Sequence, residues 1–131
     1  MCPSAALAYR LVSNFDPDLI GVIYDPGNMV CEGYENWQMG LELLGPYLSH
    51  VHVKNAAWLQ TGETADGEKQ WRHQMVAIKE GSVSWPEVLL ALSRVGYQGW
   101  LSFEDFGPGS TETKLADNLA YIKGLVDRLD I

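Results

Sequence analysis

Cysteine is scarce in this sequence, and long apolar runs are missing from it. The two cysteines, Cys2 and Cys31, match neither a Cys-x-x-Cys pair nor a zinc-binding spacing. A disulfide-stabilised secreted scaffold is therefore not expected, and the reducing cytoplasm is the favoured compartment. No stretch approaches the roughly 20 apolar residues of a membrane span, and no basic segment followed by an apolar block opens the chain. We expect no membrane partner and no signal peptide.

Basic residues are also few. The 131 residues include 17 Asp and Glu against 9 Lys and Arg, which gives a formal net charge of −8 at pH 7. A negative field of this kind repels phosphate backbones, so nucleic acid is not expected as a partner. The acidic residues are spread along the chain, as is typical of a solvated surface. Hydrophobic residues make up 47% of the chain, enough for a single domain over residues 1–131 with a buried core.

Short β-rich runs alternate with segments of helical periodicity. The expected strands are Leu19 to Tyr24, His50 to Lys54 and Trp100 to Phe103. The expected helices are Pro3 to Asn14, Glu35 to Leu44, Trp85 to Val95, and a last segment that follows Ser110 and runs through Val126. Apolar residues recur at helical spacing in the first two of these helices, namely Leu7, Ala8, Leu11 and Val12, then Met39, Leu43 and Leu44. Strands that alternate with helices through short connections predict an α/β fold with a parallel sheet.

One insertion interrupts this alternation. The segment Ala56 to Ile78 contains two β-prone runs on either side of Ala65-Asp66-Gly67, and Asp-Gly is a strong turn signal. We expect a β-hairpin that leaves the sheet after the second strand.

Residues able to bind a metal or carry a proton fall at the C-terminal ends of the strands. Asp25 follows the first strand, His52 lies near the end of the second, and Glu104 follows the third. Because side chains alternate along a strand, His52 shares its face with His50 and Lys54. Taken singly, each would more often be structural: a turn former, a hydrogen-bonded core histidine and an ion-pair partner. Together, at the edge where parallel α/β folds place their sites, they predict one shared site.

Four motifs then follow one another in a characteristic order. They are Gly21-Val-Ile-Tyr-Asp-Pro-Gly-Asn28, His50-Val-His-Val-Lys-Asn55, Glu80-Gly-Ser-Val-Ser-Trp85 and Gly96-Tyr-Gln-Gly-Trp-Leu-Ser-Phe-Glu104. Over nearly the whole chain they resemble the second half of the xylose isomerase-like TIM barrel family, the sugar-phosphate isomerases and epimerases. The resemblance implies a partial (β/α) TIM barrel, with about three of the usual eight barrel strands, alternating helices and the hairpin insertion. It also implies an isomerase or epimerase that acts on a small sugar or sugar phosphate.

The resemblance further implies a set of site residues. In that family a divalent metal at the barrel mouth is held by a Glu, an Asp, a His and a second Glu. By motif, the last three correspond to Asp25, His52 and Glu104, and Glu104 would also be a catalytic base that moves a proton next to a carbonyl. The family's Asp-x-x-His element ends here in Asn28, which can hydrogen-bond a substrate hydroxyl but cannot act as a charged acid.

Other substrate contacts and the metal are less closely defined. Lys54 and Asn55 are candidate substrate contacts, while Trp58, Trp71 and Trp100 could either stack on a sugar or pack in the core. Oxygen-rich ligation favours Mn²⁺ or Mg²⁺, with Co²⁺ or Zn²⁺ as alternatives.

The resemblance covers only the C-terminal half of a barrel. The family's first ligand Glu would lie just before Pro3, where Met1 stands in this sequence. The chain is thus expected to be a truncated form or a fragment, with impaired or partner-dependent activity. Because open strand edges and an uncovered inner face favour association, we expect a homodimer. Two alternatives stay open: a non-catalytic barrel remnant or interaction module, and, less favoured, a DNA-repair endonuclease on the same barrel, which would need more metal ligands.

Overall fold

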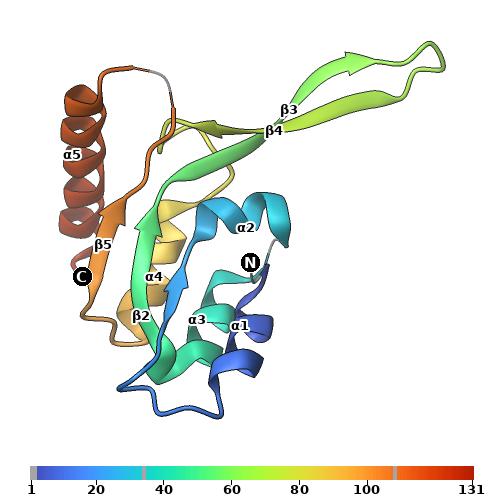
Figure 1. The fold of residues 1–131 in the computed structure, drawn as a ribbon. Coiled ribbons are helices and arrows are strands. Elements are labelled where there is room, and N and C mark those ends of the chain that lie inside the picture. The colour runs from blue at the N-terminus through green and yellow to red at the C-terminus, as the bar shows by residue number, and fades with distance from the viewer. Residues whose placement is uncertain (1–2, 34, 108) are drawn as a thin grey trace.

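Three parallel strands form the main sheet of the computed structural model, in which residues 3–33, 35–107 and 109–131 are described. The strands β1 (Val22–Tyr24), β2 (Leu48–Val53) and β5 (Trp100–Phe103) lie in the order β1-β2-β5 (Figure 1). The described residues do not close a barrel. The arrangement is that of a partial TIM barrel, as the sequence predicts.

Four helices cover one face of this sheet. They are α1 (Ala5–Val12), α3 (Trp37–Leu44), α4 (Trp85–Arg94) and α5 (Thr111–Leu129), and each packs against the next (Figure 1). The core lies between these helices and the sheet, and its most deeply buried side chains are Leu41, Leu44, Val51, Val53, Trp85 and Val88. In the described part of the chain no helix covers the opposite face, where Ile23 is 54% exposed and Trp100 is 80% exposed.

The helices begin and end close to the predicted positions, but two of them bury only part of the predicted apolar repeat, namely Ala8 and Val12 of α1 and Leu44 of α3. The helix α1 is capped by Ser4 and α3 by Asn36, and α3 ends at Gly45. A 3-10 turn, η1 (Gly45–Tyr47), then leads into β2. The predicted apolar repeats include four side chains that are exposed in the structure, which are Leu7, Leu11, Met39 and Leu43. Each helix carries apolar residues over more than one face, and the sheet covers only one.

The first strand is shorter than predicted, because a turn takes up its first residues. The Asp16 carboxylate accepts a hydrogen bond from the Asp18 backbone N–H, and the Asp16 carbonyl accepts one from Leu19. Leu19 is consequently in a turn and 85% exposed.

A short helix that the sequence pattern does not predict follows β1. This helix, α2 (Pro26–Glu32), begins directly after Asp25, whose side chain accepts a hydrogen bond from the Asn28 backbone N–H. Its opening Pro-Gly pair resembles a turn, although proline suits the first position of a helix. The helix packs against the end of the sheet that carries the polar strand-end residues.

The predicted hairpin is confirmed and projects from the domain as an arm (Figure 1). Its strands β3 (Asn55–Glu63) and β4 (Lys69–Val76) are antiparallel. Gly67 takes the positive φ of 86° that the tight turn requires. The base of the hairpin is held to α2, because the Trp58 indole N–H donates to the Val30 carbonyl at 3.0 Å.

The structure also bears on the predictions about membrane spans and cysteines. None of the helices in residues 3–33, 35–107 and 109–131 has the length and apolar character needed to cross a membrane. Cys31 is a free thiol, whereas Cys2 lies outside the described residues.

Candidate functional site

The register of the parallel sheet brings Asp25, His52 and Glu104 together. The pairing of β1 with β2 places Asp25, the residue after β1, beside His52. On the other side of β2, the Glu104 backbone N–H donates to the carbonyl of Val53 at 3.1 Å. One ligand atom from each of the three side chains lies within 4.8 Å of the other two. The side chains therefore converge, as their strand-end positions predict.

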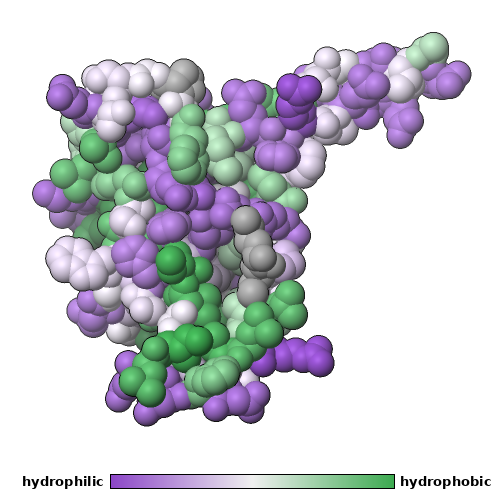
Figure 2. Space-filling model, viewed as in Figure 1, coloured by the Kyte–Doolittle hydropathy of each residue, from purple (hydrophilic) through white to green (hydrophobic). Residues whose placement is uncertain are grey.

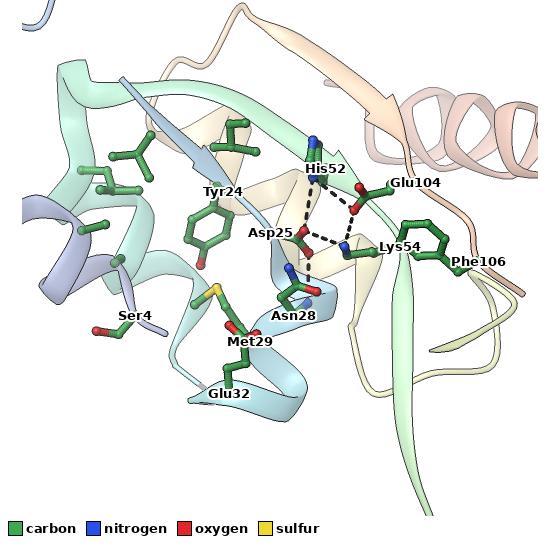
Figure 3. A pocket seen from close by; sticks show the side chains of 15 residues that line it. Ser4, Tyr24, Asp25, Asn28, Met29, Glu32, His52, Lys54, Glu104 and Phe106 are labelled. Atoms are coloured by element: carbon green, nitrogen blue, oxygen red, sulfur yellow. Dashed lines mark hydrogen bonds and ion pairs between the residues drawn. The ribbon is translucent and has the colours of Figure 1, made fainter. Parts of the chain in front are cut away.

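A single nitrogen of His52 lies between the two carboxylates. Its Nδ1 is 3.2 Å from Asp25 Oδ2 and 3.3 Å from Glu104 Oε2 (Figure 3). The other oxygen of Asp25, Oδ1, accepts the Asn28 N–H at 2.9 Å and caps α2. Asp25 thus uses one oxygen to begin a helix and turns the other toward the site.

A lysine completes the cluster. Lys54 is 6% exposed, and its Nζ lies 2.9 Å from Asp25 Oδ2 and also pairs with Glu104 Oε2. Burial by itself would lower the pKa of Lys54, but hydrogen bonds to Glu104 and Asp25 and the charges of these carboxylates raise the pKa above its ordinary value. Lys54 is therefore a buried ammonium at neutral pH. The sequence places Lys54 on the face of His52, yet this double ion pair is not predicted from it.

The two asparagines proposed as substrate contacts lie in different surroundings. Asn28 lies in the first turn of α2 and lines the pocket next to Asp25 (Figure 3). Asn55 is 2% exposed, and its Nδ2 donates to the carbonyls of Ile78 and Val83 at 2.8 and 3.1 Å. Its Oδ1 accepts the Val83 N–H at 2.8 Å. A substrate contact of Asn55 stays a prediction, and this hydrogen bonding argues for a structural role.

The cluster opens into a cavity of about 470 Å³, a size that suits a small ligand. Its apolar and aromatic lining includes Tyr24, Met29 and Phe106 (Figure 3), together with Ile23. Burial, together with the nearby charge of Glu35, raises the pKa of Tyr24, so its hydroxyl stays protonated. These lining residues are not predicted from the sequence, because they converge only when α1, α2 and the strand ends are assembled.

His50 lies next to the site, whereas the three candidate tryptophans lie outside its cavity. His50 lies one pleat below His52, with its Nε2 2.5 Å from Ser102 Oγ, and this hydrogen bond is typical of an interior histidine. Trp58, Trp71 and Trp100 are 46%, 56% and 80% exposed, so none of them is a core residue. None of the three lines the cavity beside Asp25.

The donor set fits a hard or borderline divalent cation. Two carboxylate oxygens and one imidazole nitrogen are ligands that Mn²⁺, Mg²⁺ and Zn²⁺ accept, and atoms within 4.8 Å of one another can share one ion. Three protein ligands would leave further coordination positions open toward the cavity.

Comparison with known proteins is consistent with this geometry. The family model of the xylose isomerase-like TIM barrel matches residues 1–125. An inosose dehydratase of Bacillus anthracis is 29% identical over 104 residues, which cover 72% of this chain and 33% of the relative. Inosose dehydratase 2 of Bacillus cereus is 30% identical over 107 residues, with the same coverage of 72% and 33%. The chain thus spans about a third of the length of these curated relatives.

Solved structures share the fold over almost the whole chain. A xylose isomerase domain protein from Planctomyces limnophilus matches with a TM-score of 0.74 at 25% identity. The match covers 97% of this chain and 45% of the Planctomyces chain. A 3-keto-D-glucoside 4-epimerase from E. coli matches with a TM-score of 0.64 at 20% identity. This match covers 93% of this chain and 40% of the epimerase chain. Because the family model matches residues 1–125, the chain belongs to the xylose isomerase-like TIM barrel family, of which it forms a partial barrel.

Proposed function

We propose that this chain forms the metal-binding part of a sugar isomerase or epimerase, in which Asp25, His52 and Glu104 hold a divalent cation. The observation that carries the proposal is the convergence of these three side chains at the open end of a parallel sheet. The relatives support the sugar-converting class, since they include dehydratases and epimerases of sugars and related compounds. We infer Mn²⁺ or Mg²⁺ as the cation, with Co²⁺ or Zn²⁺ as alternatives.

The reaction we propose is proton transfer next to a carbonyl of an open-chain sugar or sugar phosphate. A bound divalent cation would supply polarisation of the carbonyl and of the neighbouring hydroxyl. Glu104 would remove or return the proton. Its Oε2 faces His52 and the proposed metal position, which leaves Oε1 available for proton transfer. Asn28, on the cavity wall, would hydrogen-bond a hydroxyl of the substrate.

Three outcomes can follow the same first step. Return of the proton to the adjacent carbon gives isomerisation, and its return to the opposite face of the same carbon gives epimerisation. Loss of the hydroxyl β to the carbonyl, which leaves as water with a proton, gives dehydration. The inosose dehydratases among the relatives favour dehydration as the alternative. A second carboxylate base would have to come from another part of the barrel or from another copy of the chain, and we propose a homodimer as the assembled state.

The rival functions find less support. In residues 3–33, 35–107 and 109–131 one group of three potential ligands is present, fewer than an endonuclease with several zinc ions needs. The net charge of −8 also opposes binding of DNA. A non-catalytic remnant would keep the fold and lose turnover, and experiment separates it from an enzyme.

Metal binding is tested by calorimetric titration with Mn²⁺. The chain should bind weakly, and Asp25→Ala and Glu104→Ala should each weaken binding by more than about tenfold, since even outer residues of a metal site can contribute that much. Glu63→Ala removes an exposed carboxylate of the hairpin and should leave the affinity unchanged. Equal affinity in all four proteins would show that the ion binds elsewhere.

Catalysis is tested separately by proton exchange. D-fructose and D-tagatose are incubated with the Mn²⁺-loaded protein in D₂O, and deuterium next to the carbonyl is followed by NMR. Incorporation that Glu104→Gln abolishes is the expected result. Metal binding without incorporation for any sugar tested would favour the remnant.

A further inference from the structure

We propose that Lys54 is an internal counter-ion that occupies the cation position of this site and competes with a divalent metal for the same two carboxylate oxygens. The inference rests on the proposed metal site and adds to it a residue that sets its affinity. When a metal binds, the Lys54 ammonium must leave the carboxylates.

The contacts of Lys54 identify the atoms in competition. Because Asp25 Oδ1 is engaged by the cap of α2, Oδ2 is the oxygen of Asp25 that faces the site. Lys54 Nζ lies 2.9 Å from this same Oδ2 and pairs with Glu104 Oε2, and these are also the two oxygens nearest to His52 Nδ1. An ion bound at about 2.0–2.6 Å from both oxygens would lie against the ammonium. A divalent cation and an ammonium at such a separation repel each other strongly.

The surroundings hold the lysine in place. Its side chain is 5% exposed. The helix α2 packs directly on the aliphatic stem, because a Cβ added at Gly27 would come within 2.5 Å of Lys54 Cγ. The glycine of the Asp25-Pro-Gly-Asn28 segment therefore leaves room for this lysine. Lys54 is thus built into the site and is not a surface side chain that has folded inward.

The same surroundings offer the displaced ammonium a place to go. The Phe106 ring lies 5.5 Å from Lys54 Nζ, within the range of a cation–π contact, and it lines the same cavity. An ammonium that turned toward this ring would face the cavity and could contact an oxygen of a bound sugar. Displacement would thereby convert a structural ion pair into a substrate contact.

A purely structural role of Lys54 predicts the opposite result. If the ammonium only orients the carboxylates for the metal, its removal should weaken metal binding. If it competes, its removal should strengthen binding. The sign of the change therefore decides between the two roles.

The test is calorimetric titration of the full chain with MnCl₂. We expect Lys54→Met and Lys54→Gln to bind Mn²⁺ about tenfold more tightly or better than the unmodified chain, because a buried like charge is removed. Lys69→Met is the matched control: it removes the same charge from an exposed ion pair with Glu63 on the hairpin and should leave the affinity unchanged. Lys54→Arg keeps the charge and should bind as weakly as the unmodified chain.

Thermal unfolding gives an independent readout. Without metal, Lys54→Met leaves two carboxylates without their counter-ion and should melt at a lower temperature, and Mn²⁺ should raise this temperature more than that of the unmodified chain. Equal or weaker Mn²⁺ binding by both Lys54 variants would overturn the competition while the proposed metal site stands, provided that Asp25→Ala still loses binding. Absence of binding in every protein, including Lys54→Met, would refute the metal site and the competition with it.

Discussion

At the scale of single residues, Asp25 combines two roles in one carboxylate. Oδ1 accepts the Asn28 N–H and begins α2, while Oδ2 faces His52 and Lys54. The roles can be separated because an asparagine keeps the capping oxygen but loses the negative charge. The helix and the site are therefore coupled through this residue.

The first prediction compares Asp25→Asn with Asp25→Ala. Both should lose Mn²⁺ binding, but only the alanine variant also loses the cap, so its free energy of unfolding should be lower than that of the asparagine variant by about 1 kcal/mol. Urea titrations in the absence of metal measure the difference. Equal stability of the two variants would show that the cap contributes nothing to α2.

The second prediction concerns Asn55. Its buried amide connects β3 to the segment that precedes α4, so Asn55→Ala leaves the Val83 N–H and two carbonyls without partners. We expect a loss of about 1–3 kcal/mol in the free energy of unfolding, measured by urea denaturation. Gln60→Ala, on the exposed part of the hairpin, serves as the control and should change stability little. A fully stable Asn55→Ala protein would restore the role of substrate contact.

The third prediction is a pH dependence that arises from Asp105. Burial works against the charged form of this carboxylate, but hydrogen bonds from Asn118 and the Gly107 N–H, with the charge of Lys114, lower its pKa below the ordinary value. A carboxylate whose pKa is lower in the folded state contributes stability above its unfolded pKa of about 3.9, and this contribution is lost as the pH falls through the folded value.

Comparison with Asp105→Asn isolates that contribution. The variant should be less stable than the unmodified chain at pH 7, and the difference should shrink as the pH falls below about 4. Urea denaturation across this range measures it, with Asp117→Asn on the exposed side of α5 as the control. A stability difference that is constant with pH would exclude the ionisation of Asp105 as its source.

At the scale of elements, the hairpin consists of a base that contacts the domain and an outer part that does not. Hydrogen bonds of Trp58 and Asn55 hold its base to the domain. Residues 61–70 form the outer part, are mostly exposed, and pair only with one another across the two strands. A two-stranded ribbon is only marginally stable by itself in water. The outer part should therefore add little to the stability of the domain.

The fourth prediction follows from this division. Replacement of residues 61–70 by Asn-Gly lets Gln60 and Trp71, which face each other, flank a two-residue turn. We expect the melting temperature and the affinity for Mn²⁺ to stay close to those of the unmodified chain. A large loss of cooperative unfolding would show that the outer ribbon packs on another part of the assembled protein.

The strand ends and the hairpin could be predicted because their signals are local. Side-chain alternation fixes the faces of Asp25, His52 and Glu104, and Asp66-Gly67 marks the turn. The buried faces of α1 and α3 could not be predicted in the same way. Met39 and Leu11 have the same apolar character as Leu41, and only the position of the sheet decides which of them is covered. The ion pairs of Lys54 likewise depend on the register between separate strands.

At the scale of the whole molecule, apolar side chains remain on two surfaces. Phe15, Leu19, Ile20 and Ile23 are exposed on the loop after α1 and on β1, where Figure 2 shows apolar residues gathered in the lower part of the view. Trp100 lies on the same face of the sheet as Ile23, because both residues are in register with His50. The second surface lies on α1 and α3 and includes Leu11 and Met39. Exposed apolar areas of this kind are typical of association sites.

The final prediction is that the helix-free face of the sheet forms the contact of a homodimer. Covering a large apolar side chain contributes roughly 1.5–3 kcal/mol, a sizeable share of a domain's net stability of about 5–15 kcal/mol. In the described part of the chain, β1 and β5 are each paired on one side only, which leaves open backbone groups at the two edges of this sheet. Light scattering at micromolar concentration should give twice the mass of one chain. Trp100→Lys should shift it to the monomer, whereas Met39→Lys, on the helical surface, should not. A cooperatively unfolding monomer, or a dimer that only Met39→Lys disrupts, would place the contact elsewhere and leave the open face to another part of a barrel.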